Sequence, residues 1–479
     1  MNVLFVNYGD FTTNSLNHIA GFARGLADLG HACAVAVPEG KDTLSVVPDP
    51  RFRALTYAEA LAAPALFPDG RAADLIHAWT PREGVRKFVL AYQARARARL
   101  IVHLEDNEEF LLASWLRLNW EEVRGLSETE LAQHSAAALS HPRRYRHFLA
   151  AADAVTVIVE SLRQFAPAGV PCELLEPGVD FSRFHPQAPD PARRRELGLR
   201  ETEKAIVFTG STTFANESEM AELYRAVGLL NEGGIATRLV RTGLTSPGFL
   251  ARLPEQTRAF VIDLGFVPKD ALPGLLALAD VLVQPGAPGP FNDFRLPSKL
   301  PEFLAMGRPV VLPAANIGLA MREGNDGLLL RDGRPEEIAA ACRRVFADPA
   351  AARSMGERAA ELARRRFDLA ANSRRLGELY ARVVAAPVRP GAAAGMAGEE
   401  SELSLALRGL AARTADPAAA GLAADLAPLV AALDRQEIAR AERMQLEREI
   451  ALTHQHAANL NREVAAARKK IPRLEESLR

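Results

Sequence analysis

The chain has 479 residues and a formal net charge of −1, with 58 basic and 59 acidic side chains. At about 150 residues per domain, this length suggests roughly three structural units, each able to bury a core. The balanced charge excludes a protein whose overall field attracts nucleic acid. A hydrophobic fraction of 48% with 24% charged residues is typical of a folded globular protein rather than a disordered or collagen-like chain.

Three widely separated cysteines, Cys33, Cys172 and Cys342, form no paired or clustered motif. A disulfide framework and a zinc site are therefore both disfavoured, and no metal is expected. The N-terminus lacks the basic segment of a signal peptide, and no stretch approaches the ~20 apolar residues of a transmembrane helix. These features favour a cytoplasmic location.

The first part of the chain alternates short apolar strands with amphipathic helices. Asn2–Asn7 is predicted to form a buried parallel strand, and apolar residues recur at helical spacing between Ser15 and Leu29. The further predicted strands are Ala34–Val37, Asp74–His77, Leu100–Leu104, Ala154–Val159 and Glu173–Leu175. This alternation predicts a doubly wound, Rossmann-like α/β domain over residues 1–195.

The alternation starts again after a segment rich in proline and arginine, Pro186–Arg200. The strands predicted in this second unit are Ala205–Thr209, Thr237–Arg241, Ala259–Asp263, Val281–Gln284 and Pro309–Leu312. Neither first turn carries the glycine fingerprint G-x-G-x-x-G, which disfavours an NAD-dependent enzyme. A second Rossmann-like domain is therefore predicted over residues 196–366.

The C-terminal part of the chain differs in composition from both predicted domains. Proline, glycine and alanine dominate Pro387–Glu400, and we place a linker at residues 386–420. Apolar residues with alternating spacings of four and three then mark a helical tail over residues 421–479, interrupted at Pro472. Two interpretations remain open: self-association or partner binding as a coiled coil, and packing on the chain's own globular part.

The most informative segment, Phe291–Val311, has the sequence FNDFRLPSKLPEFLAMGRPVV. Its pattern predicts a turn, then a short helix capped by Ser298, then a strand. Free N–H groups at the start of such a helix suit a diphosphate, whose charge Lys299 and Arg295 can neutralise. Glu302, one turn later, can accept hydrogen bonds from vicinal sugar hydroxyls. The alternative is that these side chains only decorate an exposed turn.

This segment resembles the donor-binding motif of family 4 glycosyltransferases, which have the two-domain GT-B fold. Glu302 occupies the position of the second glutamate of the family's motif, and Ala305–Val311 fits its sequence A-x-G-x-P-V-V. The first glutamate of the motif is absent, because Phe294 stands in its place. The neighbouring Asp293 is the expected substitute, so it joins the predicted donor-binding residues.

Other segments carry the same resemblance over roughly residues 1–385. They are Ala152–Thr156, Glu160–Leu162, Glu176–Asp180, Phe184–Pro186, Leu278–Val281 and Asn325–Leu329. Phe367–Tyr380 resembles the family's last helix, which crosses back to the first domain, and we place that helix at about residues 367–385. The resemblance implies a GT-B fold, in which the two Rossmann-like domains face a cleft.

The loop after the first strand of the second domain departs from the family's pattern. Relatives carry an arginine and a lysine there, whereas Gly210–Glu217 contains no basic residue. Arg241, at the end of the next strand, is the candidate for the missing charge, with an ordinary surface arginine as the alternative. Asn216 is a further candidate to hydrogen-bond the donor.

Acidic residues follow the predicted strand Leu100–Leu104, in the sequence VHLEDNEE. Many relatives carry an active-site histidine just after this strand, but His103 lies within it and is expected to be structural. A carboxylate at the carboxyl end of the strand faces the cleft, where it can orient the acceptor hydroxyl or take its proton. Asp106 is the first candidate and Glu105 the second, with a solvated acidic turn as the alternative.

The loop after the first strand is expected to form the acceptor side of the cleft. Gly9, Thr12 and Asn14 are its candidate residues. His18, on the helix that follows, matches a histidine often seen in the family, although a structural role on the helix face is equally compatible with its position.

The resemblance implies a retaining, metal-independent hexosyltransferase that moves a sugar from a nucleotide-sugar to a hydroxyl acceptor, in cell-surface glycan or glycoconjugate synthesis. The nucleotide-sugar is a substrate, so no cofactor is expected, nor is a nucleic-acid partner. The acceptor class is open among glycans, lipid-linked molecules and proteins. Basic stretches at Arg82–Arg99 and His141–His147 suit an anionic lipid or the inner membrane face, or are simply a solvated basic surface.

Two other functions remain as alternatives. One is a degenerate GT-B module that acts as an interaction scaffold, or a homo-oligomer, through residues 421–479. The other is a sugar-nucleotide epimerase on the same fold, which the transferase-like segments disfavour.

Overall fold

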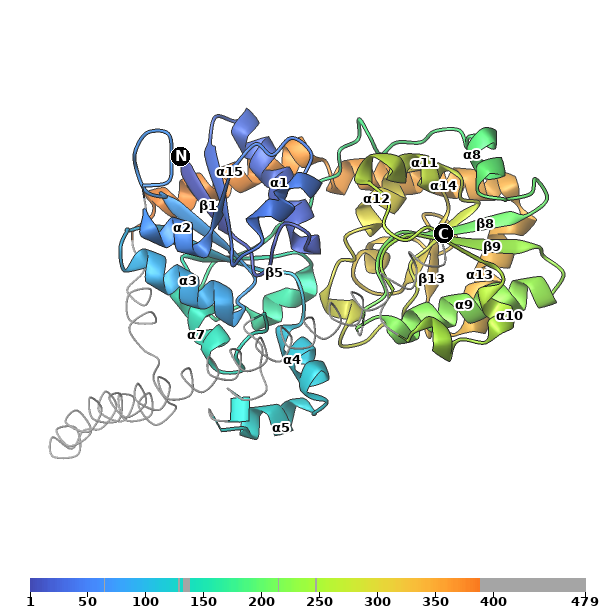
Figure 1. The fold of residues 1–479 in the computed structure, drawn as a ribbon, viewed down its shortest axis with the longest axis horizontal. Coiled ribbons are helices and arrows are strands. Elements are labelled where there is room, and N and C mark those ends of the chain that lie inside the picture. Colours follow the sequence, from blue (N-terminus) through green and yellow to red (C-terminus); the bar gives the residue numbers. More distant parts are fainter. Residues whose placement is uncertain (64, 128–129, 132–137, 214, 246–247, 388–479) are drawn as a thin grey trace, which may run out of the picture.

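The computed structural model describes residues 1–387, apart from 64, 128–129, 132–137, 214 and 246–247. Two α/β domains, each built on one parallel sheet, lie side by side in Figure 1. The predicted tail at 421–479, and all but the first two residues of the predicted linker at 386–420, lie outside the described residues. No helix among those described is long and apolar enough to cross a membrane.

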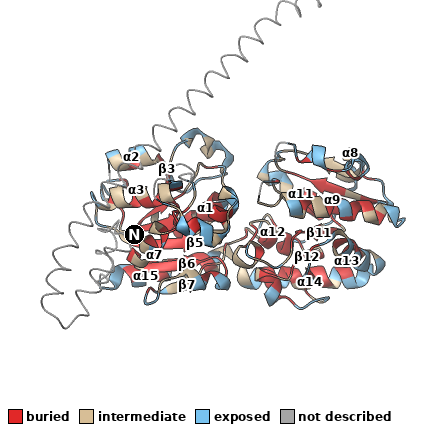
Figure 2. Cartoon of the chain, turned by 90° about the horizontal axis from the view of Figure 1, so that it is seen from below, coloured by how far each residue is buried: buried red, intermediate tan, exposed pale blue. Residues whose placement is uncertain are grey.

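The first domain contains a seven-stranded parallel sheet in the order β3-β2-β1-β4-β5-β6-β7. Its strands are β1 (Asn2–Val6), β2 (Ala32–Val37), β3 (Arg53–Thr56), β4 (Leu75–Trp79), β5 (Arg99–Leu104), β6 (Ala154–Val157) and β7 (Cys172–Leu174). The central strands are buried, as Figure 2 shows, because helices cover both faces of the sheet. The edge strand β3 was not predicted, because it has four residues, of which only two are buried.

Helices follow most strands of the first domain. They are α1 (Asn14–Asp28), η1 (Lys41–Val46), α2 (Tyr57–Ala62), α3 (Glu83–Gln93), α4 (Glu108–Leu116), α5 (Trp120–Gly125), α7 (Arg144–Ala151) and η2 (Glu160–Phe165). In α1, the apolar residues Leu16, Ile19, Phe22 and Leu26 recur every three or four positions and form one buried face. This face packs on the sheet, as the periodicity predicted.

The second domain contains a six-stranded parallel sheet in the order β10-β9-β8-β11-β12-β13. Its strands are β8 (Lys204–Phe208), β9 (Thr237–Arg241), β10 (Val261–Asp263), β11 (Val281–Val283), β12 (Val310–Pro313) and β13 (Leu328–Leu330). Three-residue β13 was not predicted, because so short an apolar run has no recognisable period. The two doubly wound parallel sheets confirm the predicted fold class.

The helices of the second domain include several single turns at the ends of strands. They are α8 (Pro191–Glu196), α9 (Glu217–Glu232), η3 (Leu250–Arg252), α10 (Glu255–Arg258), η4 (Lys269–Ala271), α11 (Leu272–Ala277), η5 (Asn292–Phe294), α12 (Leu300–Ala305), η6 (Asn316–Ala320), α13 (Pro335–Ala347) and α14 (Pro349–Arg366). The segments that follow β8, β9 and β11 matter most below, because they lie at the carboxyl ends of central strands.

The last described helix, α15 (Leu369–Ala385), returns from the second domain to the first and packs beside α1, as Figure 1 shows. The two helices approach so closely that a Cβ atom on Gly25 would lie 2.0 Å from the hydroxyl of Ser373. At the start of α15, the Asn372 amide donates hydrogen bonds to the carbonyls of Glu176, Pro177 and Arg366. This one side chain therefore ties the end of the first domain to the chain that leaves the second.

A buried hydrogen-bond network anchors α15 to the first sheet. The Tyr380 hydroxyl lies 2.7 Å from Nδ1 of His77 in β4, and Nε2 of His77 lies 3.0 Å from the hydroxyl of Thr156 in β6. The Thr156 hydroxyl also lies 2.8 Å from Nδ1 of His103. Burial lowers the pKa of His77 to about 3, so its ring is neutral at pH 7. His103 is likewise buried within β5, in the structural position expected from the sequence.

We predict that Tyr380→Phe destabilises the protein by about 1–3 kcal/mol, because it leaves a buried nitrogen of His77 without its partner. Urea unfolding, followed by circular dichroism, measures this loss. Arg382→Ala on the same helix removes an exposed ion pair with Glu173 and should cost less than about 1 kcal/mol. Equal stabilities of the wild type and Tyr380→Phe would show that the network does not hold α15 in place.

Candidate active site between the two domains

The predicted donor-binding segment forms η5, a turn and the short helix α12. The helix begins after Lys299, which is its N-cap, and no side chain caps it, so the predicted capping by Ser298 is wrong. Pro301 lies in the first turn, as expected from its sequence position. Because α12 has only six residues, an anion at this place depends on the charged side chains around it rather than on a long helix dipole.

Lys299 lies across the carboxyl end of β8. Its Nζ lies 4.7 Å from the centre of the Phe208 ring and 3.5 Å from the side-chain oxygen of Gln284, which follows β11. A Cβ atom on Gly210 would lie 2.7 Å from Cε of the lysine, and Gly210 has a φ of +129°. Glycine at this position therefore makes room for Lys299. Burial, together with the nearby Arg295, lowers the pKa of Lys299 to about 8.

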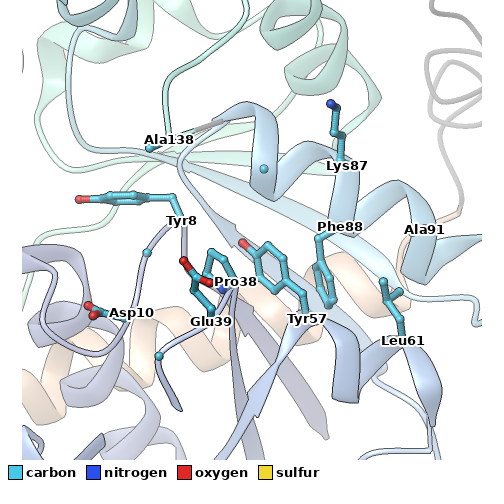
Figure 3. A pocket seen from close by; sticks show the side chains of 13 residues that line it. Tyr8, Asp10, Pro38, Glu39, Tyr57, Leu61, Lys87, Phe88, Ala91 and Ala138 are labelled. Carbon is cyan, nitrogen blue, oxygen red and sulfur yellow. The ribbon is translucent and has the colours of Figure 1, made fainter. Parts of the chain in front are cut away.

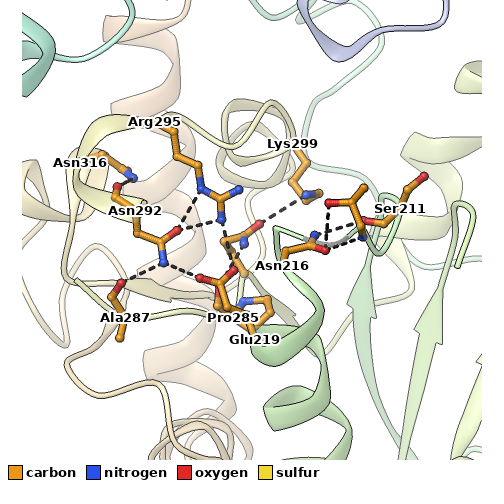
Figure 4. A network of polar contacts seen from close by, with 11 residues as sticks. Ser211, Asn216, Glu219, Pro285, Ala287, Asn292, Arg295, Lys299 and Asn316 are labelled. Atoms are coloured by element: carbon orange, nitrogen blue, oxygen red, sulfur yellow. Dashed lines mark hydrogen bonds and ion pairs between the residues drawn. The ribbon is translucent and has the colours of Figure 1, made fainter. Parts of the chain in front are cut away.

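Arg295 is held by a polar network, which Figure 4 shows. Its guanidinium donates to Glu219 of α9 at 3.2 Å and to the side-chain oxygen of Asn292 at 2.8 Å, and it stacks 3.6 Å above the Phe291 ring. The Asn292 amide donates in turn to Glu219 at 2.5 Å. Sequence reasoning missed Glu219, since it lies on a separate helix and in no recognised motif. Its carboxylate balances one of the two cations beside it.

Phe294, which stands where the family's motif has its first glutamate, contacts the first domain. The Phe294 ring packs edge-on against Phe165 of the first domain, with 5.6 Å between ring centres. The main-chain carbonyl of the adjacent Asp293 accepts a hydrogen bond from the Ser161 hydroxyl, also in the first domain. This turn therefore joins the two domains, and the half-buried side chain of Asp293 lies within it.

Glu302 lies beside a second junction between the domains. Its carboxylate is 4.0 Å from Nζ of Lys269, and the same Nζ donates to the side chain of Asn17 on α1 at 3.1 Å. Burial raises the pKa of Glu302, and the two lysines nearby oppose that rise. Burial, and to a smaller extent the charge of Lys269, lowers the pKa of His18 to about 4. Sequence reasoning did not single out Lys269.

Arg241 lies among protein atoms rather than in the cleft. Its side chain is 0% exposed. It donates hydrogen bonds to Thr212 and Thr245 and to the carbonyls of Thr242, Gly243 and Leu244. This placement excludes the alternative of an ordinary surface arginine and gives Arg241 a part in holding the loops after β8 and β9. Its contact with the donor stays a prediction. Asn216 similarly closes the loop after β8, accepting from the Thr213 N–H and donating to the Ser211 carbonyl.

The predicted catalytic carboxylates follow β5 and differ in their surroundings. Glu105 is buried and accepts hydrogen bonds from the Trp79 indole at 2.6 Å and from the Ser15 hydroxyl. Burial raises its pKa to about 7. Asp106 is more exposed and lies 3.6 Å from the guanidinium of Arg82. Burial raises the pKa of Asp106, while Arg82 and, from the second domain, Arg295 oppose the rise.

Arg82 is the centre of this acidic group. It lies 3.3 Å from Glu108 and 3.8 Å above the Tyr8 ring, in addition to its contact with Asp106. The chain reaches this position through Thr80, whose φ of +77° is strained for a β-branched residue. Sequence reasoning placed Arg82 in a basic surface stretch, and this is wrong: both Arg82 and Arg86 are buried in ion pairs.

Carboxylates also pair with the second basic stretch, His141–His147. Arg144 forms an ion pair with Glu83, and Arg146 forms one with Glu109.

The predicted acceptor-side loop lies after β1. Thr12 and Asn14 are exposed and Gly9 is half-buried.

The two groups of charged residues face each other. The Asn107 amide donates to the Pro290 carbonyl at 3.2 Å, and the Phe110 and Phe291 rings stack with their centres 5.7 Å apart. The turn that carries Glu105 and Asp106 therefore meets the segment that carries Arg295. Among the described residues, no group of three or more histidine, cysteine or acidic side chains is arranged to hold a metal.

We predict that Lys299 makes anion binding depend on pH. An anion favours the protonated lysine, so the affinity for pyrophosphate should be highest below pH 8 and fall by up to about tenfold per pH unit above it. Calorimetry from pH 6.5 to 9.5 measures this. The arginine of Lys299→Arg stays charged throughout this range, so the affinity of this variant should not show the decrease above pH 8. Ionisation of pyrophosphate itself affects the wild type and the variant equally. Identical pH profiles for the two proteins would contradict the assignment.

Comparison with known proteins shows what the second domain resembles. Residues 203–348 match the family model of glycosyl transferases group 1. An uncharacterised glycosyltransferase of Methanocaldococcus jannaschii is 31% identical over 159 residues, which are 32% of this chain and 39% of the relative. A D-inositol 3-phosphate glycosyltransferase of Rhodococcus opacus is 27% identical over 190 residues, or 37% and 41% of the two chains. The chain thus spans about two fifths of the length of these curated relatives.

Solved structures match over both domains. HepE from Anabaena, in complex with UDP and glucose, has a TM-score of 0.59 at 18% identity and covers 80% of this chain and 99% of its own. Sucrose-phosphate synthase from Thermosynechococcus elongatus has a TM-score of 0.62 at 17% identity and covers 81% and 100%. Likeness at this identity establishes the two-domain GT-B fold. Residues 203–348, in the second half of this GT-B fold, resemble the glycosyl transferases group 1 family.

Proposed function

We propose that the protein transfers a sugar from a nucleotide-sugar donor to a hydroxyl acceptor, with the donor on the second domain and the acceptor on the first. The observation that carries the proposal is the pair of cations Lys299 and Arg295 in the second domain, of which Arg295 lies near enough to Asp106 of the first domain to oppose the rise in its pKa. The solved complexes of HepE with UDP and glucose and with UDP-glucose support a donor of this class.

On the donor side, the two cations provide the main chemical contribution. Negative charge grows on the diphosphate as its bond to the sugar breaks, and fixed positive groups stabilise that charge most in a site shielded from water. Gly210 and Gln284 hold the Lys299 side chain in position, and Glu219 and Phe291 hold that of Arg295. In the proposal, Glu302, which lies 4.0 Å from Lys269, accepts hydrogen bonds from the ribose hydroxyls.

On the acceptor side, we assign the two carboxylates different parts. Asp106 lies nearer the second domain and orients the acceptor hydroxyl or accepts its proton. Both oxygens of Glu105 are already engaged, by Trp79 and Ser15, so Glu105 positions the end of β5 instead. Closure of the domains over the bound substrates would exclude water and limit hydrolysis of the donor.

Further parts of the proposal come from the resemblance to family 4. They are retention of configuration at the transferred carbon, a reaction without a metal or other cofactor, and a cytoplasmic role in building cell-surface glycans or glycoconjugates. Contact with the inner membrane face and oligomerisation through residues 421–479 belong to the same group of proposals.

One observation favours the scaffold alternative. The aromatic side chain of Phe294 replaces the expected glutamate and contributes to the junction with Phe165 instead of a ligand contact. A scaffold of this kind would bind neither nucleoside diphosphates nor nucleotide-sugars, so direct binding measurements separate the two functions.

The proposed activity is tested by incubating the full chain with UDP-, GDP- and ADP-sugars together with a panel of glycan, lipid-linked and protein acceptors, and measuring release of the nucleoside diphosphate. We expect one donor class to be turned over, and Lys299→Ala to lower that turnover by about 10²–10³-fold, since a cation on the leaving group is lost. Lys204→Ala is the matched control, because Lys204 lies at the amino end of β8, away from the cleft. A chain that binds and turns over none of the donors would exclude the transferase function.

The parts assigned to the two carboxylates give a second prediction. Asp106→Asn should lower kcat by about 10²–10⁴-fold with little change in the donor KM, because a proton acceptor is lost. It should also remove the acidic limb of the pH profile, which reports a pKa raised by burial. Glu105→Gln keeps an oxygen for the Trp79 indole and should cost less than about tenfold. The opposite ranking of the two variants would transfer the catalytic part to Glu105.

A further inference from the structure

A pocket with a volume of about 950 Å³ opens in the first domain beside the acidic group around Arg82. As Figure 3 shows, it lies among the loop after β1, the loop after β2, the start of α2 and one side of α3. Tyr8 belongs both to this pocket and to the acidic group, since its ring contacts Arg82. The pocket therefore adjoins, across Tyr8, the place where the proposed function puts the reacting hydroxyl.

The floor of the pocket is aromatic and rigid. The rings of Tyr57 and Phe88 stack with their centres 4.3 Å apart and their planes 24° from parallel. The Tyr57 hydroxyl donates to the main-chain carbonyl of Asn7 at 2.5 Å, which fixes the ring and occupies its polar end. Leu61 and Ala91 extend the apolar surface. Such a lining binds a flat apolar group by stacking and by removal of its surface from water.

The charges around the pocket disfavour an anion. Among the lining residues, Asp10 and Glu39 are acidic and Lys87 is basic, which leaves a net charge of −1. Lys87 already takes part in another interaction, and in Figure 3 its side chain extends away from the Tyr57 and Phe88 rings. Arg82, which lies against the Tyr8 ring, is paired with Glu108 and Asp106. The carboxylates of Asp10 and Glu39 would therefore repel a phosphate on the acceptor.

We propose that this pocket binds the non-reacting part of the acceptor, and that this part is an uncharged aromatic group, as in an aryl glycoside. The inference rests on the proposed function and adds the chemical class of its second substrate. The acceptor would place its aromatic group against Tyr57 and its hydroxyl beyond Tyr8, toward Asp106. Charge selects against phosphorylated acceptors, and the stacked rings select for a flat group over a small polar one.

The test uses three related probes: phenyl β-glucoside, methyl β-glucoside and phenyl β-glucoside 6-phosphate. Their dissociation constants for the full chain are measured by ligand-observed NMR, with UDP titrated separately. We expect the phenyl glucoside to bind at least about tenfold more tightly than either of the others. Equal or tighter binding of the methyl or the phosphorylated probe would overturn the proposal.

Two variants locate the binding and test the charge argument. Ala91→Phe fills the pocket and should weaken the phenyl glucoside at least about tenfold, whereas Ala94→Phe, on an exposed position three residues later, should not. Glu39→Lys reverses the charge of an exposed side chain. It should reduce the difference in affinity between phenyl β-glucoside and phenyl β-glucoside 6-phosphate. An unchanged affinity in Ala91→Phe, or an unchanged difference in Glu39→Lys, would contradict the assignment.

The UDP titration separates this inference from the function on which it rests. If UDP or a nucleotide-sugar binds and phenyl glucoside does not, the acceptor class is wrong while the transferase function stands. If no nucleoside diphosphate or nucleotide-sugar binds, the transferase function fails, and any phenyl glucoside binding is then not acceptor binding. Ala91→Phe should leave the UDP affinity within about twofold of the wild type, because Ala91 lies on the first domain.

Discussion

The parallel direction of every strand within each sheet is the constraint on which the rest of this structure depends. Because all strands of a sheet end at the same edge, the segments after β1, β4 and β5 gather in one domain, and those after β8, β9 and β11 gather in the other. Residues far apart in the chain, such as Tyr8, Arg82 and Asp106, become neighbours only for this reason. The return of α15 to the first domain then gives the two domains a second covalent link, which the Tyr380–His77 hydrogen bond and the Asn372 amide secure.

Charge burial explains how the charged side chains on the two facing domains are organised. A charge removed from water is costly unless a partner and hydrogen bonds compensate for it, and both sides of the cleft follow this rule. Arg82 is surrounded by carboxylates and an aromatic ring, and Arg295 is held by Glu219 and an aromatic ring. Lys299 is the least compensated of these cations, with an amide oxygen and a ring beside it and a lowered pKa. An incoming anion would stabilise Lys299 more than it would the two arginines.

The departures from the family's motif are connected to one another. Phe294 replaces a glutamate and packs against the first domain, while Arg241 is buried in a loop-holding role and the loop after β8 has no basic residue. The donor side therefore has fewer polar contacts than the resemblance implies, and the junction between the domains has more apolar ones, including Phe110 against Phe291. In the proposed function, recognition of the donor therefore depends mainly on Lys299, Arg295 and Glu302.

Local pattern and composition alone determined the strand–helix alternation, the doubly wound sheets, and the segment around Lys299. Apolar runs and helical periodicity are local signals, and a motif carries its spacing with it. The edge strands β3 and β13 were not predicted, because they are short. The predicted N-cap at Ser298 was wrong, because the helix begins one residue later than its sequence suggested.

Only the tertiary structure decided which charged side chains are ligand candidates and which are structural. It buried Arg241, Arg82 and Arg86, brought Glu219 to Arg295 and Lys269 to Glu302, and formed the aromatic pocket from segments after five different strands. The physical reason is that burial and pairing are properties of the whole packed chain. A residue's type and its immediate neighbours in sequence do not specify which distant atoms will surround it.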